Sequence, residues 1–362
     1  MTELLPWIIV AAVIAAAIGF ALGRRNGPFD EFAPRAVNPA APPAPWPTQP
    51  VITASTGPAA GPSVRPTLTP AQPPAGALTL ATARSWGYQL QNLDLKRAAA
   101  SPFDLLVIDH AKDGSHATAL TAAEVERLKS KPDGSRRLVV AYCSIGEAES
   151  YRAYWQKSWA KQPPAWLLGE NPEWEENYAV CFWDPAWQRL FCGGQGALID
   201  QLVAQGFDGI YLDKCDVTED LREHFKAAAR SRPDLDGDMV AFVERIAATA
   251  RAKRPGFLVI MQNAEPLLER PELRRVIDAV AKEELLYGLD RPEKANTHEE
   301  IEESRRLLDL MRADGKPVFV VEYLGNEGKI RDAATAVRKL GYTLYVAPKD
   351  RELNRLGPAI AT

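Results

Sequence analysis

Carboxylate and amide side chains recur in this sequence directly after short apolar runs. Asp213 ends one such run, Gly206-Phe-Asp-Gly-Ile-Tyr-Leu-Asp213, whose glycine-flanked start is typical of a turn that leads into a buried strand. A lone aspartate in this place commonly caps the next helix. The chain repeats the pattern, however, with Gln89, Gln91, Asp109, His110, Ser144, Glu147, Gln262, Asn263, Glu283, Glu284, Glu322 and Tyr323. Acids gathered at one place can act as a proton donor beside an ionised partner. They can also bind sugar hydroxyls or a hard cation such as Mg²⁺.

Eight runs of strand-forming residues must position these side chains, and helical patterns lie between most of them. The expected strands are 86–91, 105–110, 138–146, 209–213, 257–262, 277–283, 318–323 and 343–347. The expected helices are 122–130 after an N-cap at Thr121, 195–205, 238–253, 299–312 and 329–340. This alternation predicts an α/β fold, a closed (β/α)₈ TIM barrel whose strand ends meet at one mouth. An open doubly wound sheet is the alternative, although no Gly-rich phosphate loop follows an early strand.

Residues 148–208, between the third and fourth expected strands, form an insertion too long for an ordinary βα loop. It contains Trp155, Trp159, Trp166, Trp174, Trp183 and Trp187, together with Tyr151, Tyr154 and Tyr178. Flat aromatic faces stack on the apolar faces of sugar rings, so a cap built here would favour carbohydrate at the mouth. We expect at least half of these tryptophans to form the core of the cap itself.

Five blocks of the chain together resemble one enzyme family. They are Ser85-Trp-Gly-Tyr-Gln-Leu-Gln91, Ala141-Tyr-Cys-Ser-Ile-Gly-Glu-Ala-Glu-Ser-Tyr-Arg-Ala-Tyr-Trp155, Gly206-Phe-Asp-Gly-Ile-Tyr-Leu-Asp213, Gln262-Asn263 and Val321-Glu-Tyr323. They are similar to glycoside hydrolase family 114, the endo-α-1,4-polygalactosaminidase-like proteins that are sometimes labelled cysteinyl-tRNA synthetase-related. The similarity runs from about Ser85 to Asn354. The synthetase label has no support, because the chain shows no nucleotide-binding signature.

The resemblance implies a TIM barrel that acts on α-linked galactosamine-containing polysaccharide, with a catalytic Asp after the fourth strand and a Glu on the sixth. These positions fall on Asp213 and Glu283. Glu284 competes with Glu283, since adjacent residues of a regular strand face opposite ways. Asp213 would attack or stabilise the anomeric carbon while Glu283 protonates the leaving oxygen. Carboxyls about 5–5.5 Å apart would predict retention of configuration, and about 6.5–9.5 Å inversion.

The remaining mouth residues are expected to bind substrate. Asp109, Glu147 and Glu322 would bind sugar hydroxyls or an ammonium group, and tyrosines would wall the subsite. The full predicted binding set is Tyr88, Asp109, Tyr142, Glu147, Tyr211, Gln262, Asn263, Glu284, Glu322 and Tyr323. Two other functions stay open, a membrane-tethered barrel that binds polysaccharide without cleaving it and a Mg²⁺-dependent phosphate-handling barrel.

Composition limits the partners. The net charge of −4 gives no indication of a nucleic-acid partner, and the four cysteines and four histidines lack metal-ligand spacing. We therefore expect no metal site and no cofactor, and a monomer whose partners are a polysaccharide and a membrane.

The expected membrane contact lies at the N-terminus. Residues 4–22 carry no charge and are long enough to span a bilayer, which predicts an anchor within 1–25; a cleaved signal peptide is the alternative. Residues 27–80 hold fourteen of the 29 prolines, so 26–80 is expected to be a disordered Pro/Ala-rich linker before a hydrolase-like domain over 81–362.

Two features of the sequence predict opposite orientations in the membrane. Arg24 and Arg25 favour a cytoplasmic C-terminal side, whereas a polysaccharide hydrolase on a long spacer belongs outside. We expect a membrane-anchored, extracytoplasmic (periplasmic or cell-surface) domain, with a cytoplasmic orientation as the alternative. Disulfides between Cys143 and Cys215 or between Cys181 and Cys192 would indicate export, and free thiols the cytoplasm.

Overall fold

Eight parallel strands form a single sheet in the order β1-β2-β3-β7-β8-β9-β10-β11. The computed structural model describes residues 78–172 and 174–360, so the expected anchor, and the linker as far as residue 77, lie outside the described residues. The strands are β1 (Trp86–Gln89), β2 (Leu105–Ile108), β3 (Leu138–Ser144), β7 (Gly209–Asp213), β8 (Leu258–Gln262), β9 (Ala279–Glu283), β10 (Val318–Tyr323) and β11 (Thr343–Ala347). Each expected strand is present, and their sequential order excludes the doubly wound alternative, in which the order reverses.

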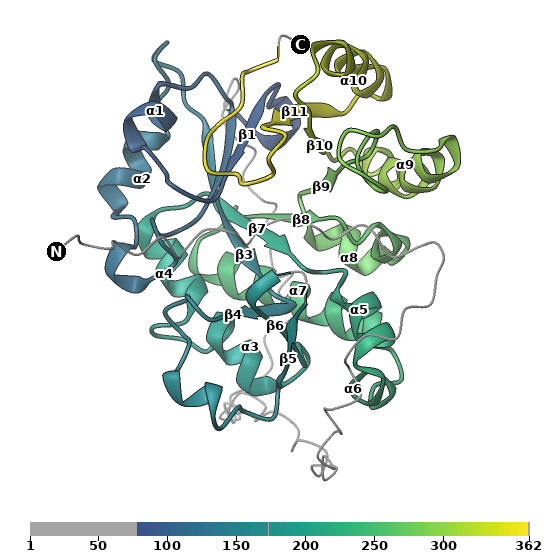
Figure 1. Cartoon of the computed structure of the whole chain (residues 1–362). Coiled ribbons are helices and arrows are strands. Elements are labelled where there is room, and N and C mark those ends of the chain that lie inside the picture. The colour runs from purple at the N-terminus through teal and green to yellow at the C-terminus, as the bar shows by residue number, and fades with distance from the viewer. Residues whose placement is uncertain (1–77, 173, 361–362) are drawn as a thin grey trace, which may run out of the picture. The chain divides into compact units, whose positions relative to one another are not determined.

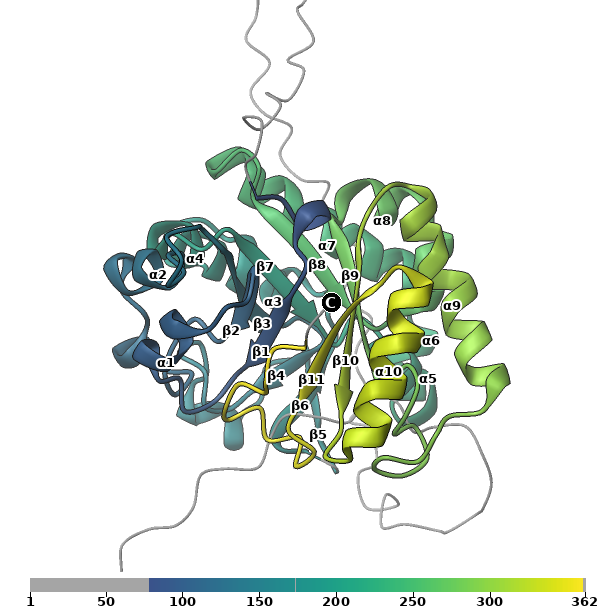
Figure 2. The same cartoon turned by 90° about the horizontal axis from the view of Figure 1, so that it is seen from above.

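Helices connect successive strands and cover the outside of the sheet. They are α1 (Leu95–Ala100), α2 (Ala122–Leu128), α4 (Leu198–Gln205), α7 (Leu235–Lys253), α8 (Pro271–Val276), α9 (His298–Ala313) and α10 (Glu327–Leu340). The connection after β7 also contains α5 (Val217–His224) and α6 (Lys226–Arg230). Figures 1 and 2 both show α1, α2 and α4 on one side of the strands and α8, α9 and α10 on the other. The architecture is a nearly closed (β/α)₈ barrel.

Local sequence explains where these helices begin and end. Thr121 and Thr297 start α2 and α9 with capping boxes, in which the threonine hydroxyl accepts an N–H and a glutamate three residues later bonds back to the threonine. Gly206 and Gly341 end α4 and α10 at φ values of +85° and +70°, a conformation that glycine adopts without strain. The expected helices are confirmed, with shifts of a few residues at their ends.

The C-terminal segment, residues 348–360, completes the barrel between β1 and β11. No hydrogen-bonded ladder joins these two strands in the described chain. The Leu353 carbonyl instead accepts the N–H groups of Leu90 and Gln91 at 2.8 and 3.1 Å, just beyond the end of β1. In Figure 1 this segment is the yellow trace that runs beside β1. The last residues of the fold therefore lie close to the mouth.

Aromatic side chains fill the barrel interior. Trp86 packs against Phe319 and Tyr345, each with ring centroids 5.6 Å apart, and Tyr88 packs against Tyr211 at 5.4 Å. All five rings are buried. Tightly packed rings make this barrel a solid core that supports the strand ends, not a pore.

The insertion after β3 forms a small subdomain on the barrel. Its strands β4 (Glu147–Glu149), β5 (Leu167–Asn171) and β6 (Trp174–Val180) make an antiparallel sheet in the order β4-β6-β5, followed by α3 (Pro185–Cys192). Trp155, Trp159, Trp166 and Trp187 contact one another in sequence, with centroids 5.0–5.3 Å apart. Four of the six tryptophans thus pack together in the cap, with Trp166 and Trp187 buried and Trp155 and Trp159 partly buried.

Two further expectations concern cysteines and the membrane. All four cysteines are free thiols, so neither candidate disulfide is formed. Within residues 78–172 and 174–360, no helix combines the length and apolar character that crossing a bilayer requires.

Arg137 provides a test of how the outer helices are held. Its guanidinium is buried and donates to the carbonyls of Ala98, Ala99 and Ser101 at the end of α1, at 2.7–2.9 Å. We predict that Arg137→Met lowers the free energy of unfolding by roughly 2–4 kcal/mol, because it leaves these carbonyls without a charged donor. Urea unfolding followed by circular dichroism measures the change.

The neighbouring Arg136→Met is the matched control. Arg136 is exposed and pairs with Glu126 at 2.7 Å on the surface, so its loss should cost less than about 1 kcal/mol. Equal effects of the two substitutions would contradict the role assigned to Arg137.

Candidate active site

Three neighbouring strands, β7, β8 and β9, end on polar residues at the mouth. Their last residues are Asp213, Gln262 and Glu283. The residue that follows each strand, Lys214, Asn263 and Glu284, has a φ of +58°, +51° and +55°. Non-glycine residues rarely take this left-handed conformation, which costs on the order of 1 kcal/mol or more each. The chain therefore turns sharply after each strand and leaves the terminal side chain at the mouth.

The Asp213 carboxyl is buried but hydrogen-bonded. One oxygen accepts the Tyr142 hydroxyl at 2.7 Å, the other accepts the backbone N–H of Lys214 at 2.7 Å, and the residue is 8% exposed. Burial, followed by the negative charge of Glu283, raises the pKa of Asp213 to about 6, while the Tyr142 hydrogen bond opposes this rise. Asp213 can thus change its protonation state near neutral pH.

The Glu283 carboxylate is held by neutral donors. It accepts hydrogen bonds from the Gln262 amide, from the Asn263 amide at 3.3 Å and from the Tyr323 hydroxyl, and the residue is 6% exposed. Gln262 is oriented in turn by the Tyr88 hydroxyl, which donates to its amide oxygen at 3.1 Å. Because these donors fix both carboxylate oxygens, Glu283 has a defined direction at the mouth.

Glu284 takes a different direction from Glu283. It follows the end of β9 in the left-handed conformation, and its carboxylate forms an ion pair with Arg351 of the C-terminal segment. Gly288, at φ +114°, leaves room for it, since a Cβ there would lie 2.0 Å from a Glu284 oxygen. Between these neighbours, Glu283 is the one bonded to the predicted site residues Gln262, Asn263 and Tyr323.

Glu147 is paired with a cation. Its carboxylate lies 3.2 Å from the Lys214 ammonium and accepts the Asn171 amide at 2.9 Å. Burial nevertheless raises the pKa of Glu147. Lys214 also pairs with Asp220 at 3.1 Å. The residue directly after Asp213 thus joins β7 to the insertion and to α5.

Asp109 is likewise paired, through Arg152 of the insertion. The Arg152 guanidinium lies 2.6 Å from Asp109 and 2.7 Å from Glu149, and all three side chains are buried. Lys214 and Arg152 were not predicted as site residues. Signals for both existed, because Lys214 follows Asp213 and Arg152 belongs to the block at 141–155.

Three predicted binding residues lie away from the surface of the mouth. Glu322 is fully buried and accepts the backbone N–H groups of Leu286 and Tyr287 at 2.7 and 3.3 Å. It therefore positions the loop after β9, rather than binding the sugar hydroxyls expected of it, because strand alternation turns it away from the face of Tyr323. Tyr88 and Tyr211 are fully buried and form a floor beneath the carboxyls, not the expected wall.

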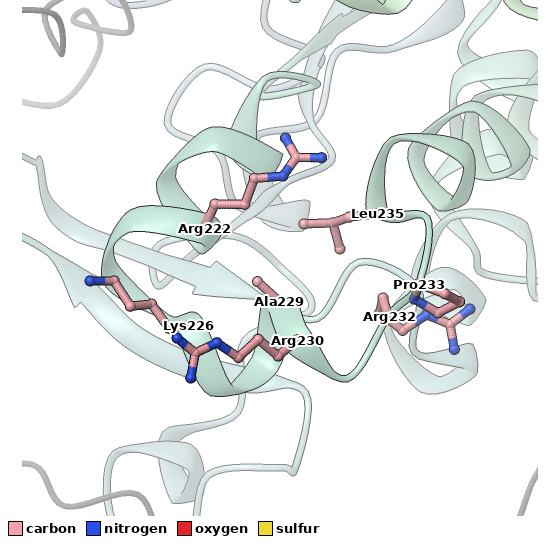
Figure 3. Close-up of a pocket in the computed structure, with 7 residues that line it drawn as sticks. All are labelled: Arg222, Lys226, Ala229, Arg230, Arg232, Pro233 and Leu235. Carbon is pink, nitrogen blue, oxygen red and sulfur yellow. The ribbon is translucent and has the colours of Figure 1, made fainter.

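The described residues contain no group of three or more His, Cys, Asp or Glu side chains arranged to hold a metal ion. A separate hollow of about 390 Å³ lies in the connection after β7, and Figure 3 shows its lining by Arg222, Lys226, Ala229, Arg230, Arg232, Pro233 and Leu235. Two of its arginines are neutralised, Arg222 by Asp236 at 2.8 Å and Arg232 by Asp238 at 2.6 Å. The hollow shares no residue with the carboxyl pair.

Solved structures resemble this barrel. The glycoside hydrolase domain of PelA from Pseudomonas aeruginosa matches with a TM-score of 0.53 and 22% sequence identity, covering 75% of this chain and 96% of that domain. At this identity the match shows the fold.

Relatives by sequence are closer. An uncharacterized protein of Deinococcus radiodurans is 39% identical over 288 residues, 78% of this chain and 86% of that protein. Uncharacterized proteins of Methanocaldococcus jannaschii and Thermotoga maritima are 39% and 33% identical, each over 75% of this chain and over 77% and 83% of their own lengths. The model of glycoside-hydrolase family GH114 matches residues 67–361. With the barrel and its paired carboxyls, this match shows that the chain belongs to glycoside-hydrolase family GH114.

Proposed function

We propose that this protein is an endo-acting hydrolase that cleaves internal bonds of α-1,4-linked galactosamine-containing polysaccharide, with Asp213 and Glu283 as its catalytic carboxyls. The observation that supports this most is their arrangement. Both are buried at one mouth, at the ends of β7 and β9 with β8 between them, and the charge of Glu283 raises the pKa of Asp213. Paired carboxyls of this kind are the machinery of glycoside hydrolysis. The polymer itself is carried over from the resemblance.

The proposed reaction uses the two carboxyls in turn. Asp213, ionised, attacks the anomeric carbon or stabilises its positive charge, while Glu283 gives its proton to the oxygen of the departing sugar. Glu283 then takes a proton from the water that completes hydrolysis. The negative charge of Glu283 raises the pKa of Asp213, so the protonation of Asp213 depends on its partner. The Tyr142 and Tyr323 hydroxyls hold the pair in place.

Removing either carboxyl tests the assignment. We predict that Asp213→Asn and Glu283→Gln each lower kcat at least about a thousandfold on partially deacetylated α-1,4-galactosamine polymer, because neither amide can replace the lost charge or proton. Chromatography of released oligosaccharides measures the rate.

Asp290→Asn serves as the control, since Asp290 is an exposed partner of Lys294 in the loop after β9. Full activity in either carboxyl variant would overturn the mechanism. Binding of polymer without products from the wild type would instead favour the non-catalytic binding barrel.

The pH dependence separates the two roles. Because the raised pKa of Asp213 is about 6, its ionised form predominates above that pH, and kcat/KM should rise through pH 6 if Asp213 acts as the anion. Tyr142→Phe removes a hydrogen bond that favours the charged form of Asp213, so the rise in kcat/KM should move to higher pH.

Tyr211→Phe is the matched control for this shift. The Tyr211 hydroxyl is buried in the floor beneath the carboxyls and has no hydrogen-bond partner in the described chain. Its removal should therefore leave the rise in kcat/KM at the same pH. A kcat/KM that falls as the pH passes 6 would show that Asp213 is the proton donor and that the roles are exchanged.

The proposal also places the barrel outside the cytoplasm, tethered through residues 1–25. The support is the uncharged stretch at 4–22 and the proline-rich spacer after it, whereas the four free thiols favour the cytoplasmic alternative. We predict that protease added to cells with a permeabilised outer envelope degrades the barrel, whereas cytoplasmic marker proteins stay intact. A protected barrel would establish the cytoplasmic orientation.

A further inference from the structure

Arg351 reaches the mouth from the C-terminal segment, far from the other site residues in sequence. The segment is anchored on both sides of β1's end, where Gln89 donates to the Asn354 carbonyl at 3.1 Å and Leu353 accepts from Leu90. Arg351 and Leu353 have φ values of +64° and +47°. Such conformations persist in non-glycine residues only where surrounding contacts enforce them. The fold thus holds Arg351 in a defined place.

The Arg351 side chain lies among residues of the carboxyl pair. Its guanidinium forms an ion pair with Glu284 and sits 5.6 Å from the ring centroid of Tyr323, the donor to Glu283. The side chain is only 16% exposed. Arg351 therefore brings a cation from the C-terminal segment to the ends of β9 and β10.

Two nitrogens of this arginine, Nε and Nη2, have no hydrogen-bond partner in the described residues, although Nη2 takes part in the ion pair with Glu284. The Nε–H of Arg351 is buried and has no hydrogen-bond partner among residues 78–172 and 174–360. Burial also lowers the pKa of the guanidinium. Buried polar groups are nearly always hydrogen-bonded, so each exception calls for a partner or a role. An acceptor from bound substrate would satisfy this donor.

We infer that Arg351 is a substrate-binding residue whose Nε–H donates to an oxygen of the sugar held beside Tyr323. The acceptor is a ring hydroxyl or an N-acetyl carbonyl, because an ammonium group carries only donors. This inference deepens the proposed function and rests on it for the identity of the polymer. It makes the C-terminal segment part of the sugar subsite, although its residues follow the last strand.

Arg351→Lys in the full-length chain isolates the contact. Lysine keeps a positive charge for Glu284 but has no Nε–H group in the arginine geometry. We expect KM to rise about tenfold, the usual scale for one hydrogen bond to a charged group, with kcat within about threefold and an unchanged Tm. Arg355→Lys is the matched control, because Arg355 lies in the same segment and is exposed, paired with Asp350.

Oligosaccharides of α-1,4-linked galactosamine, fully acetylated or fully deacetylated, distinguish the two acceptors. A KM increase with both forms identifies a hydroxyl, and an increase confined to the acetylated form identifies the acetyl carbonyl. An unchanged KM for both overturns the inference, as does an effect no larger than that of Arg355→Lys. A lower Tm with KM and kcat altered alike would also overturn it, because it would show a purely structural role.

Binding measured in the Asp213→Asn background keeps the two proposals separable. If the wild type releases no products but Arg351→Lys still weakens oligosaccharide binding about tenfold, the hydrolase proposal fails and the inference stands. If products form and binding does not depend on Arg351, the inference alone fails. Absence of binding to both oligosaccharides overturns the inference for this class of polymer.

Discussion

Burial of two neighbouring carboxyls, held by neutral hydrogen-bond donors, is the constraint on which the rest of this structure depends. Asp213 is bonded by a phenol and a backbone N–H, and Glu283 by two amides and a phenol. Donors of this kind stabilise a negative charge without fixing it as a salt bridge would. Burial and the charge of Glu283 raise the pKa of Asp213 to about 6, so Asp213 can exchange a proton near neutral pH, as general acid–base chemistry requires.

The other acids of the mouth show the opposite arrangement. Glu147 is paired with Lys214, and Asp109 and Glu149 share Arg152. Buried charges are stable only when paired, so these acids act as anchors that join the insertion to the strand ends. Charge pairing thus separates the acids of one rim into a central pair bonded by neutral donors and outer acids paired with Lys214 or Arg152.

The support extends beneath and beside the mouth. Tyr88 lies in the aromatic floor and orients Gln262, which holds Glu283, so the packed interior determines the direction of a site carboxylate. On the side between β1 and β11, the C-terminal segment completes the barrel and delivers Arg351. The same segment that closes the fold therefore adds a cation to a mouth that is otherwise rich in acids.

The sequence by itself determined the strand order, the helices between strands and the placement of Asp213 and Glu283 at strand ends, because hydrophobic periodicity and caps are local signals. It could not separate Glu283 from Glu284, since the left-handed turn after β9 breaks the alternation on which the choice depended. Nor could it show that Glu322 accepts backbone N–H groups. The ion pairs of Lys214 and Arg152 with neighbouring acids, and the approach of Arg351 to the mouth, were equally invisible in the sequence. Those outcomes are contacts between segments far apart in the chain, and only the folded barrel brings them together.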